Sequence, residues 1–390
     1  MRTGPLQGGR TPLKLLPAPL RAIADKFADR HQSFSVVVAV AVVGALLPVI
    51  SIIPPFSGFG NQKDWVDGFA NAGVFVLLAL GLNVVVGLAG LLDLGYAAFF
   101  AIGSYAYAYG ASPFSGLELP FWPLLLVGAL VAALFGVLLG APTLRLRGDY
   151  LAIVTLGFGE IVPVVILNSD TYTNGTNGIG GVYQPNLYGL FGIHSFGFSS
   201  PWPYYVTVLV VITLAMMLLY RLQDSRLGRA WVAIREDELA AASMGINTVT
   251  TKLLAFAIGA STAGLAGVFN SAKLSLVSPD QFGFTVSFTV LAMVVLGGMG
   301  NIWGVAIGAA VIYEIQSVLL KQLTNFFQPL GIPILSTIDF VQYQFLLYGL
   351  ALVAMMLLRP EGLFPSRQRR RELHEETDEP GETNGELVQT

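Results

Sequence analysis

Three acidic residues stand within or beside long apolar stretches, where charged side chains are unusual. Asp93 follows a glycine-rich segment, and Glu160 and Glu314 lie in mostly apolar runs. Ionisable side chains in such surroundings often line paths for ions or solutes. Each also has a structural interpretation. We expect Asp93 to cap the helix that follows it. Glu160 either lines a cavity or pairs with Arg145 or Arg147, and Glu314 is expected to serve packing or pairing.

The sequence lacks the motifs of the common enzyme classes. It contains no G-x-x-x-x-G-K-[ST] phosphate-binding loop and no G-x-S-x-G nucleophile turn. Its three histidines (His31, His194 and His374) are far apart, and it has no cysteine, so no metal-ligand spacing is present. We therefore expect no catalytic residue, no metal or cofactor and no nucleic-acid partner, and the sequence favours transport over catalysis.

The elements that position these residues must be membrane helices. The chain has 390 residues, of which 54% are hydrophobic and 12% charged, against about 25% charged residues in soluble proteins. Apolar residues gather in blocks of about twenty, the length that crosses the hydrocarbon core. We predict an all-α polytopic membrane protein with ten spans, at 33–53, 69–87, 94–112, 121–140, 150–168, 203–221, 252–273, 285–300, 303–320 and 340–358. Glycines interrupt the two spans at 285–300 and 303–320. Their positions fit either a helical hairpin or two broken helices.

The basic residues indicate how the chain is oriented. Placing the N-terminus in the cytoplasm leaves only Lys63, Lys273 and Lys321 of the 21 basic residues outside, as the positive-inside rule requires. The sequence then divides into a cytoplasmic N-terminal tail (1–32), a transmembrane domain (33–358) and a cytoplasmic C-terminal tail (359–390). The last tail turns from basic to strongly acidic, which predicts disorder.

Glycine-rich segments give a second group of candidate residues. The run from Gly81 to Gly90 could allow close helix packing, or it could unwind and expose backbone to a solute. The outer segment 173–181 (TNGTNGIGG) could close a surface loop, or present backbone groups to a solute or docking protein. The candidate residues for a translocation path are Asn83, Gly87, Gly90, Asp93, Thr155 and Glu160.

The cytoplasmic loop 221–252 is predicted to contain a short helix between Asp224 and Ile246, capped by Asp224 or Ser225. Its charged residues exclude it from lipid. Small residues followed by Gly245 leave a shallow surface that a groove on a partner could accept, although a plain connecting helix is the alternative. The candidate coupling residues are Arg235, Glu236, Asp237, Glu238, Ala240, Ala241, Gly245 and Ile246.

The segment REDELAAASMGI at 235–246 resembles the coupling segment of ABC importer permeases, which docks into a groove of the ATPase subunit. In the usual pattern a glutamate stands six residues before the glycine, whereas here Leu239 holds that place and Glu238 precedes it. Further segments resemble LivM-type permeases of branched-chain amino acid ABC importers, over roughly residues 70–365. They are 81–108, 148–162, 173–181, 225–246, 252–269 and 291–311.

This resemblance implies a permease fold with two inverted halves, in the cell membrane of a prokaryote. It implies that a second homologous permease subunit and two ATPase subunits assemble with the chain. An extracytoplasmic binding protein would deliver leucine, isoleucine or valine. A urea, short-amide or pentose ABC permease, or an ion-coupled secondary transporter working alone, are the alternative functions.

Overall fold

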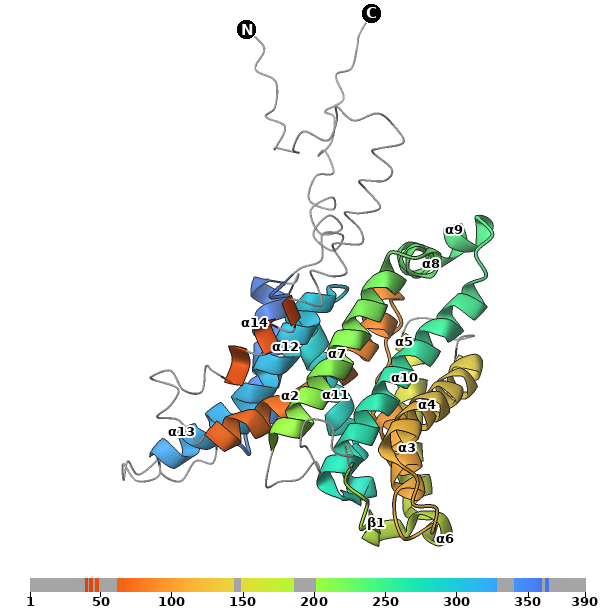
Figure 1. Cartoon of the computed structure of the whole chain (residues 1–390). Helices are drawn as coiled ribbons and strands as arrows, with labels where there is room; N and C mark the ends of the chain where they lie inside the picture. The colour runs from red at the N-terminus through yellow and green to blue at the C-terminus, as the bar shows by residue number, and fades with distance from the viewer. Residues whose placement is uncertain are drawn as a thin grey trace, which may run out of the picture.

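The computed structural model describes residues 39–40, 42–44, 46–48, 62–143, 149–185, 201–327, 340–359 and 362–364. Most of these residues are helical (Figure 1). The first predicted span (33–53), both predicted tails, and Arg145 and Arg147 lie wholly or mostly outside this part of the chain.

The long helices are α2 (Gln62–Leu82), α4 (Phe121–Thr143), α5 (Asp149–Leu167), α7 (Pro201–Gln223) and α10 (Thr248–Leu274). Shorter helices are α3 (Ala97–Gly110), α6 (Asp170–Thr173), α8 (Arg226–Glu236), α9 (Glu238–Ser243), α11 (Phe284–Gly297), α12 (Ile302–Glu314), α13 (Leu320–Phe327) and α14 (Gln344–Leu358). Two π-helical turns, η3 (Asn83–Leu88) and η7 (Ile315–Leu319), continue α2 and α12, and short 3₁₀ turns occupy Gly175–Asn177 (η4) and Pro279–Phe282 (η6).

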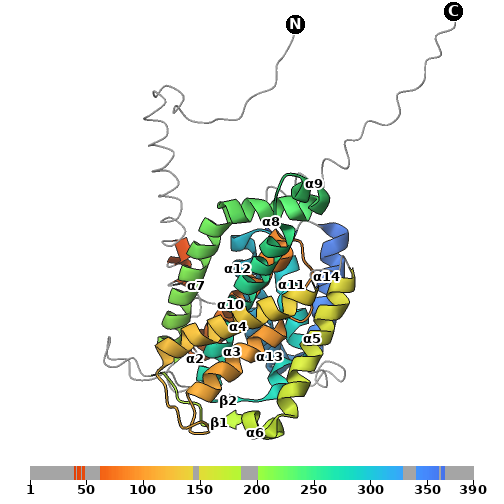
Figure 2. The same ribbon diagram turned by 90° about the vertical axis from the view of Figure 1, so that its right-hand side faces the viewer.

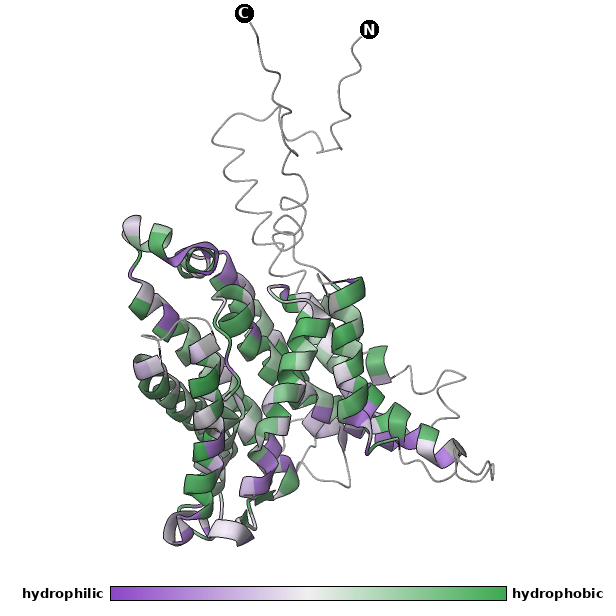
Figure 3. Ribbon diagram, turned by 180° about the vertical axis from the view of Figure 1, so that it is seen from behind, coloured by the Kyte–Doolittle hydropathy of each residue, from purple (hydrophilic) through white to green (hydrophobic). Residues whose placement is uncertain are grey.

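Seven helical segments of the described chain are long and apolar enough to cross a membrane. They match the predicted spans from 69–87 onward, apart from 94–112 and 340–358, which correspond to the shorter helices α3 and α14. The polytopic all-α fold is therefore confirmed. Figure 3 shows apolar residues along these helices and hydrophilic residues concentrated toward both ends of the molecule.

Helix α3 has only 14 residues and is preceded by the irregular segment 89–96. Its predicted span of 19 residues is therefore too long. A helix of this length covers about 21 Å, less than the ~30 Å hydrocarbon core. Irregular backbone at such a depth is tolerated where protein covers it, and α3 packs against both α4 and α10.

Small residues bring the central helices into close contact. A Cβ atom on Gly103 of α3 would overlap the Cα of Gly264 in α10, and a Cβ on Gly264 would lie 2.6 Å from the Gly128 carbonyl of α4. Backbones can approach this closely only where side chains are absent, as in other membrane helix pairs.

The 285–320 region forms a helical hairpin. Helices α11 and α12 pack against each other and are joined at Gly298–Asn301, where Gly298 and Gly300 have positive φ. Asn301 caps α12 by accepting hydrogen bonds from the amides of Trp303 and Gly304. The glycines therefore terminate α11 and shape the turn.

The two ends of the bundle are distinct (Figure 1). Helix α2 runs toward the end that carries α8 and α9, whereas α10 runs away from it, an antiparallel relation that inverted halves require. At the opposite end, β1 (Ile179–Gly180) pairs with β2 (Leu276–Val277) in an antiparallel ladder. The preceding glycine-rich segment forms tight turns, with Asn174, Gly175 and Gly178 at positive φ, and the ladder ties it to the end of α10.

Candidate functional site

The loop between α7 and α10 folds as two short helices, each started by its own cap. Ser225 caps α8, as expected, by accepting hydrogen bonds from the amides of Leu227 and Gly228. Asp237 adopts an extended conformation and caps α9, accepting from the amides of Leu239 and Ala240. The single predicted helix is therefore interrupted at Asp237, because this side chain satisfies the amides that begin a new helix.

Two contacts fix this segment onto the start of α10. Trp231 is fully buried and its indole Nε1 donates to the Thr251 carbonyl over 2.7 Å. Lys252 is buried and its Nζ lies 2.6 Å from Glu238 Oε1. Glu238 is thus engaged within the chain. The α8–α9 segment is a rigid platform and not a loose connection.

The outer face of the platform exposes two large apolar side chains beside charged and small residues. Leu239 is 64% exposed and Met244 is 82% exposed, and both project from a segment too charged to enter lipid. Glu236, Ala240 and Ala242 are also exposed, while Ile246 is half-buried. Ala241 is buried and therefore lies on the inner side. Gly245 has a φ of +85°, which favours glycine at this turn.

Arg235 points from the platform toward the transmembrane helices. Its Nη1 donates to the carbonyl of Gly87 over 2.6 Å, 148 positions earlier in the chain. Its stem packs on Gly90, where φ is +70° and a Cβ would lie 2.7 Å from Arg235 Cγ. The α8–α9 platform is therefore bonded to the end of α2.

The Gly87 carbonyl belongs to the π-helical turn η3. This turn also contacts the segment between α11 and α12. Asn83 is buried, and its Oδ1 accepts a hydrogen bond from the Gly300 amide over 2.8 Å. A Cβ on Gly87 would lie 2.7 Å from that same amide. Single π-helical turns often occur at functional sites. Here the turn joins the platform to the α11–α12 hairpin.

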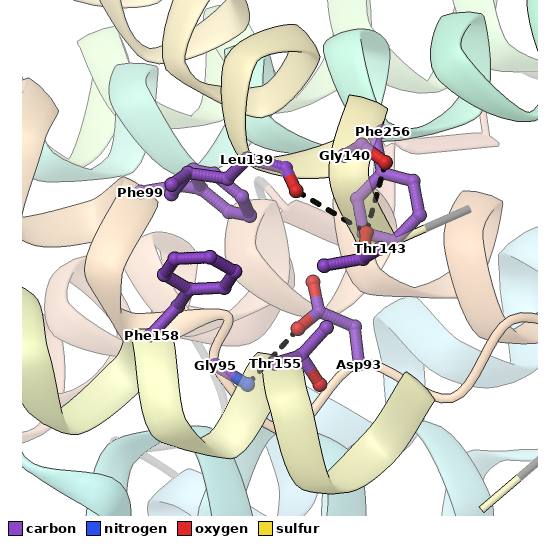
Figure 4. A pocket seen from close by; sticks show the side chains of 9 residues that line it. All are labelled: Asp93, Gly95, Phe99, Leu139, Gly140, Thr143, Thr155, Phe158 and Phe256. Carbon is purple, nitrogen blue, oxygen red and sulfur yellow. Dashed lines mark hydrogen bonds between the residues drawn. The ribbon is translucent and has the colours of Figure 1, made fainter. Parts of the chain in front are cut away.

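Asp93 lies in a small buried pocket beside α5 (Figure 4). Its Oδ1 accepts a hydrogen bond from the Gly95 amide over 2.9 Å, and Thr155 Oγ1 accepts from the Leu94 amide over 3.1 Å. Because α3 begins only at Ala97, Asp93 closes the turn before the helix and does not cap the helix itself. The pocket volume is about 10 Å³, room for about one water molecule.

Glu160 lies elsewhere, on the exposed surface of α5. This helix is the least buried of the seven spans and lies at the edge of the bundle (Figure 2). The side chain of Glu160 makes no hydrogen bond or ion pair with any residue that the structure describes. Its predicted partners, Arg145 and Arg147, lie outside those residues. A groove of about 660 Å³, almost entirely apolar, separates α5 from α3 and α4.

The predicted path residues thus fall into two groups. Asn83, Gly87, Gly90, Asp93 and Thr155 lie at the α8–α9 end of the bundle, around η3 and the segment that follows it. Thr155 and Glu160 are both on α5, but Thr155 is buried beside the Asp93 segment, whereas Glu160 is exposed. The sequence analysis named Arg235 as a coupling candidate but missed its hydrogen bond to Gly87, for which the local sequence gives no signal.

The profile of the "branched-chain amino acid transport system / permease component" family matches residues 65–358, most of the described bundle. The chain is 41% identical to the high-affinity branched-chain amino acid transport system permease protein LivM of Escherichia coli (strain K12). That alignment covers 82% of this chain and 73% of that protein.

The chain belongs to the branched-chain amino acid permease family.

The chain is also similar, at lower identity or coverage, to two other permease proteins of Escherichia coli. The permease protein LivH of Escherichia coli (strain K12), from the same transport system, is 28% identical over 64% of this chain and 83% of that protein. The ribose import permease protein RbsC of the same strain is 30% identical over 69% of this chain and 81% of that protein. LivM and LivH are both similar to the chain, so one transport system contains two homologous permeases.

Proposed function

We propose that the chain is the membrane-spanning subunit of an ATP-driven ABC importer for leucine, isoleucine and valine. The similarity to LivM over most of both chains supports this substrate class. ATP hydrolysis is assigned to separate subunits, and a binding protein delivers the solute on the other side. The α8–α9 end faces the cytoplasm of a prokaryotic cell, as do both termini, because Arg221, Arg226, Arg229 and Lys252 cluster at that end.

The observation that supports ATPase docking most directly is the pair of exposed apolar side chains on the outer face of the α8–α9 platform. Leu239 and Met244 are exposed outside the membrane helices, where water would otherwise contact them. Short apolar anchors on a rigid helix are typical of helix-in-groove recognition. The platform lies at the end of α7 and the beginning of α10, so force applied to it reaches both halves of the bundle.

Replacing Leu239 or Met244 by aspartate is expected to detach the ATPase subunits. A charge in a desolvated anchor position costs at least about 2 kcal/mol, roughly a thirtyfold loss of affinity. Co-purification from membranes measures the loss. Leu239→Met and Met244→Leu keep the volume and apolar character and should retain the ATPase. Retention of the ATPase by both aspartate variants would show that docking occurs elsewhere.

The second permease subunit and the solute path are assigned to the face of α5. A charged side chain facing lipid near the middle of a span costs about 2.5–3.5 kcal/mol, and Glu160 is near the middle of α5 without a described partner. Contact of Glu160 with another subunit, or with a water-filled path, removes that cost. The apolar groove between α5 and helices α3 and α4 supplies a wall suited to aliphatic side chains, and Thr173 is among the residues that line it.

Replacing Glu160 by leucine is therefore expected to lower uptake about tenfold or more while the importer still assembles. Uptake of radiolabelled leucine into proteoliposomes measures the effect, and the adjacent exposed Ile161→Leu change serves as the control. A more thermostable variant with normal uptake would instead place Glu160 against lipid.

A further inference from the structure

Residues 362–364, here called the strap, follow α14 and lie against the end of α11. The Leu363 amide donates to the Leu296 carbonyl over 2.9 Å, and the Phe364 amide donates to the Gly297 carbonyl over 3.3 Å. Leu296 and Gly297 are the last residues of α11, where helix carbonyls have no partner within the helix itself. The strap therefore supplies the donors that complete the end of α11.

Glycine allows the strap to reach the backbone of the hairpin turn. Gly362 is buried at a φ of +85°, and a Cβ there would lie 2.7 Å from Gly298 Cα. A Cβ on Gly298, where φ is +111°, would overlap the Phe364 carbonyl oxygen. Both positions favour glycine in conformation and in space. The strap and the turn are therefore in direct backbone contact.

Asn301 joins the strap to the start of α12. Its Nδ2 donates to the Phe364 carbonyl over 3.0 Å. Its Oδ1 caps α12 by accepting from the amides of Trp303 and Gly304. One side chain therefore serves both contacts, each with a different atom. An aspartate at this position would keep the cap and lose the donor to the strap.

The turn held by the strap is also the place where the proposed coupling pathway reaches the hairpin. The Gly300 amide donates to Asn83 Oδ1 over 2.8 Å. Asn83 lies in η3, whose Gly87 carbonyl accepts from Arg235. The strap adds little buried apolar area, because its two large side chains remain 42% and 45% exposed. Its main contribution is therefore a fixed position for the turn.

We propose that the strap positions the α11–α12 turn for coupling, so that movement of the α8–α9 platform through η3 displaces the whole hairpin. This step rests on the proposed function, in which ATP hydrolysis moves the platform. With the strap in place, the turn is fixed to both α11 and α12 and follows η3 as one body. Without it, the glycine-containing turn yields locally, and the movement is lost before it reaches the membrane helices.

Hydrogen exchange of the full-length chain in nanodiscs tests the positioning without any transport. Asn301→Asp should raise the exchange rates of the 296–301 amides about tenfold or more, because the turn opens more readily once the strap is released. The interior of α12 should keep its exchange rates, since aspartate preserves the cap.

A second variant reaches the same contact from the strap. Gly362→Ala pushes the strap away from the turn and should raise the same exchange rates. Gly116→Ala is the matched control, because Gly116 also has a positive φ (+68°) but a Cβ there meets no atom within 4 Å. Unchanged exchange of the turn in both strap variants would overturn the proposal.

Uptake and ATP hydrolysis by the reconstituted importer connect the strap to coupling. Both strap variants should take up at least about fivefold less leucine per ATP hydrolysed, with the half-saturating leucine concentration and Tm little changed. A lower Tm with a normal ratio of uptake to hydrolysis would show a merely structural strap and would overturn the proposal. Uptake without ATP by the unchanged chain would instead refute the proposed function, and the exchange result would still decide whether the strap fixes the turn.

Discussion

Replacing Arg235 by glutamine is expected to lower ATP-driven uptake about tenfold or more while the ATPase subunits stay bound. The guanidinium donates to the Gly87 carbonyl over 2.6 Å and connects the α8–α9 platform to η3. A hydrogen bond from a charged donor contributes about 1.5–3 kcal/mol, and its loss leaves a buried carbonyl without its partner. Movement of the platform would then no longer be transmitted to α2.

The matched control for this change is Arg229→Gln. Arg229 lies on the same helix, and its Nη1 also donates to a backbone carbonyl, that of Asp224, over 2.7 Å. That contact is local and exposed, so its loss should leave uptake unchanged. ATP hydrolysis and leucine uptake are measured together in proteoliposomes. We expect Arg235→Gln to hydrolyse ATP with little uptake, and equal coupling in the two variants would rule out the relay.

Replacing Gly103 by leucine is expected to prevent folding of the bundle. A side chain there would meet the backbone of α10 at Gly264, and backbone cannot move aside as a flexible side chain can. Overpacking in a core costs about 1–3 kcal/mol even where neighbours adjust, and here α3 and α10 would have to separate. The loss should therefore be larger than that range.

Fluorescence-detected gel filtration and the thermal midpoint in detergent measure this effect. Gly349→Leu is the matched control, because Gly349 lies in the apolar helix α14 and a Cβ there meets no atom within 4 Å. It should be tolerated. A monodisperse Gly103→Leu protein with an unchanged midpoint would contradict the close packing of α3 on α10.

Features with a local physical cause were predictable from the sequence. Hydropathy placed the spans because each must bury an apolar length close to the membrane thickness. Ser225 signalled the start of α8 because capping depends on neighbouring amides. The 173–181 turns followed from residues that tolerate positive φ, and the glycines near 297–304 marked the α11–α12 break without deciding between a hairpin and broken helices.

Long-range contacts were not predictable in the same way. Arg235 reaches Gly87 across 148 positions and Lys273 reaches Asp67 across 206, and no local spacing encodes either pair. The basic-residue pattern placed Lys273 on the outer side of the membrane but did not predict that it is buried. The π-helical turn η3 also escaped prediction. Its Gly87 carbonyl and Asn83 side chain bond to Arg235 and Gly300, which are distant in the sequence, and such partners leave no local pattern.

Transport by the reconstituted importer tests the central proposal most directly. The chain is combined in proteoliposomes with its second permease, ATPase and binding protein, and leucine uptake is followed with competing isoleucine, valine, urea or ribose. We expect uptake to require ATP and all subunits, and to be reduced by isoleucine and valine but not by urea or ribose. Uptake by the chain alone along an ion gradient, or a preference for urea or ribose, would contradict the account.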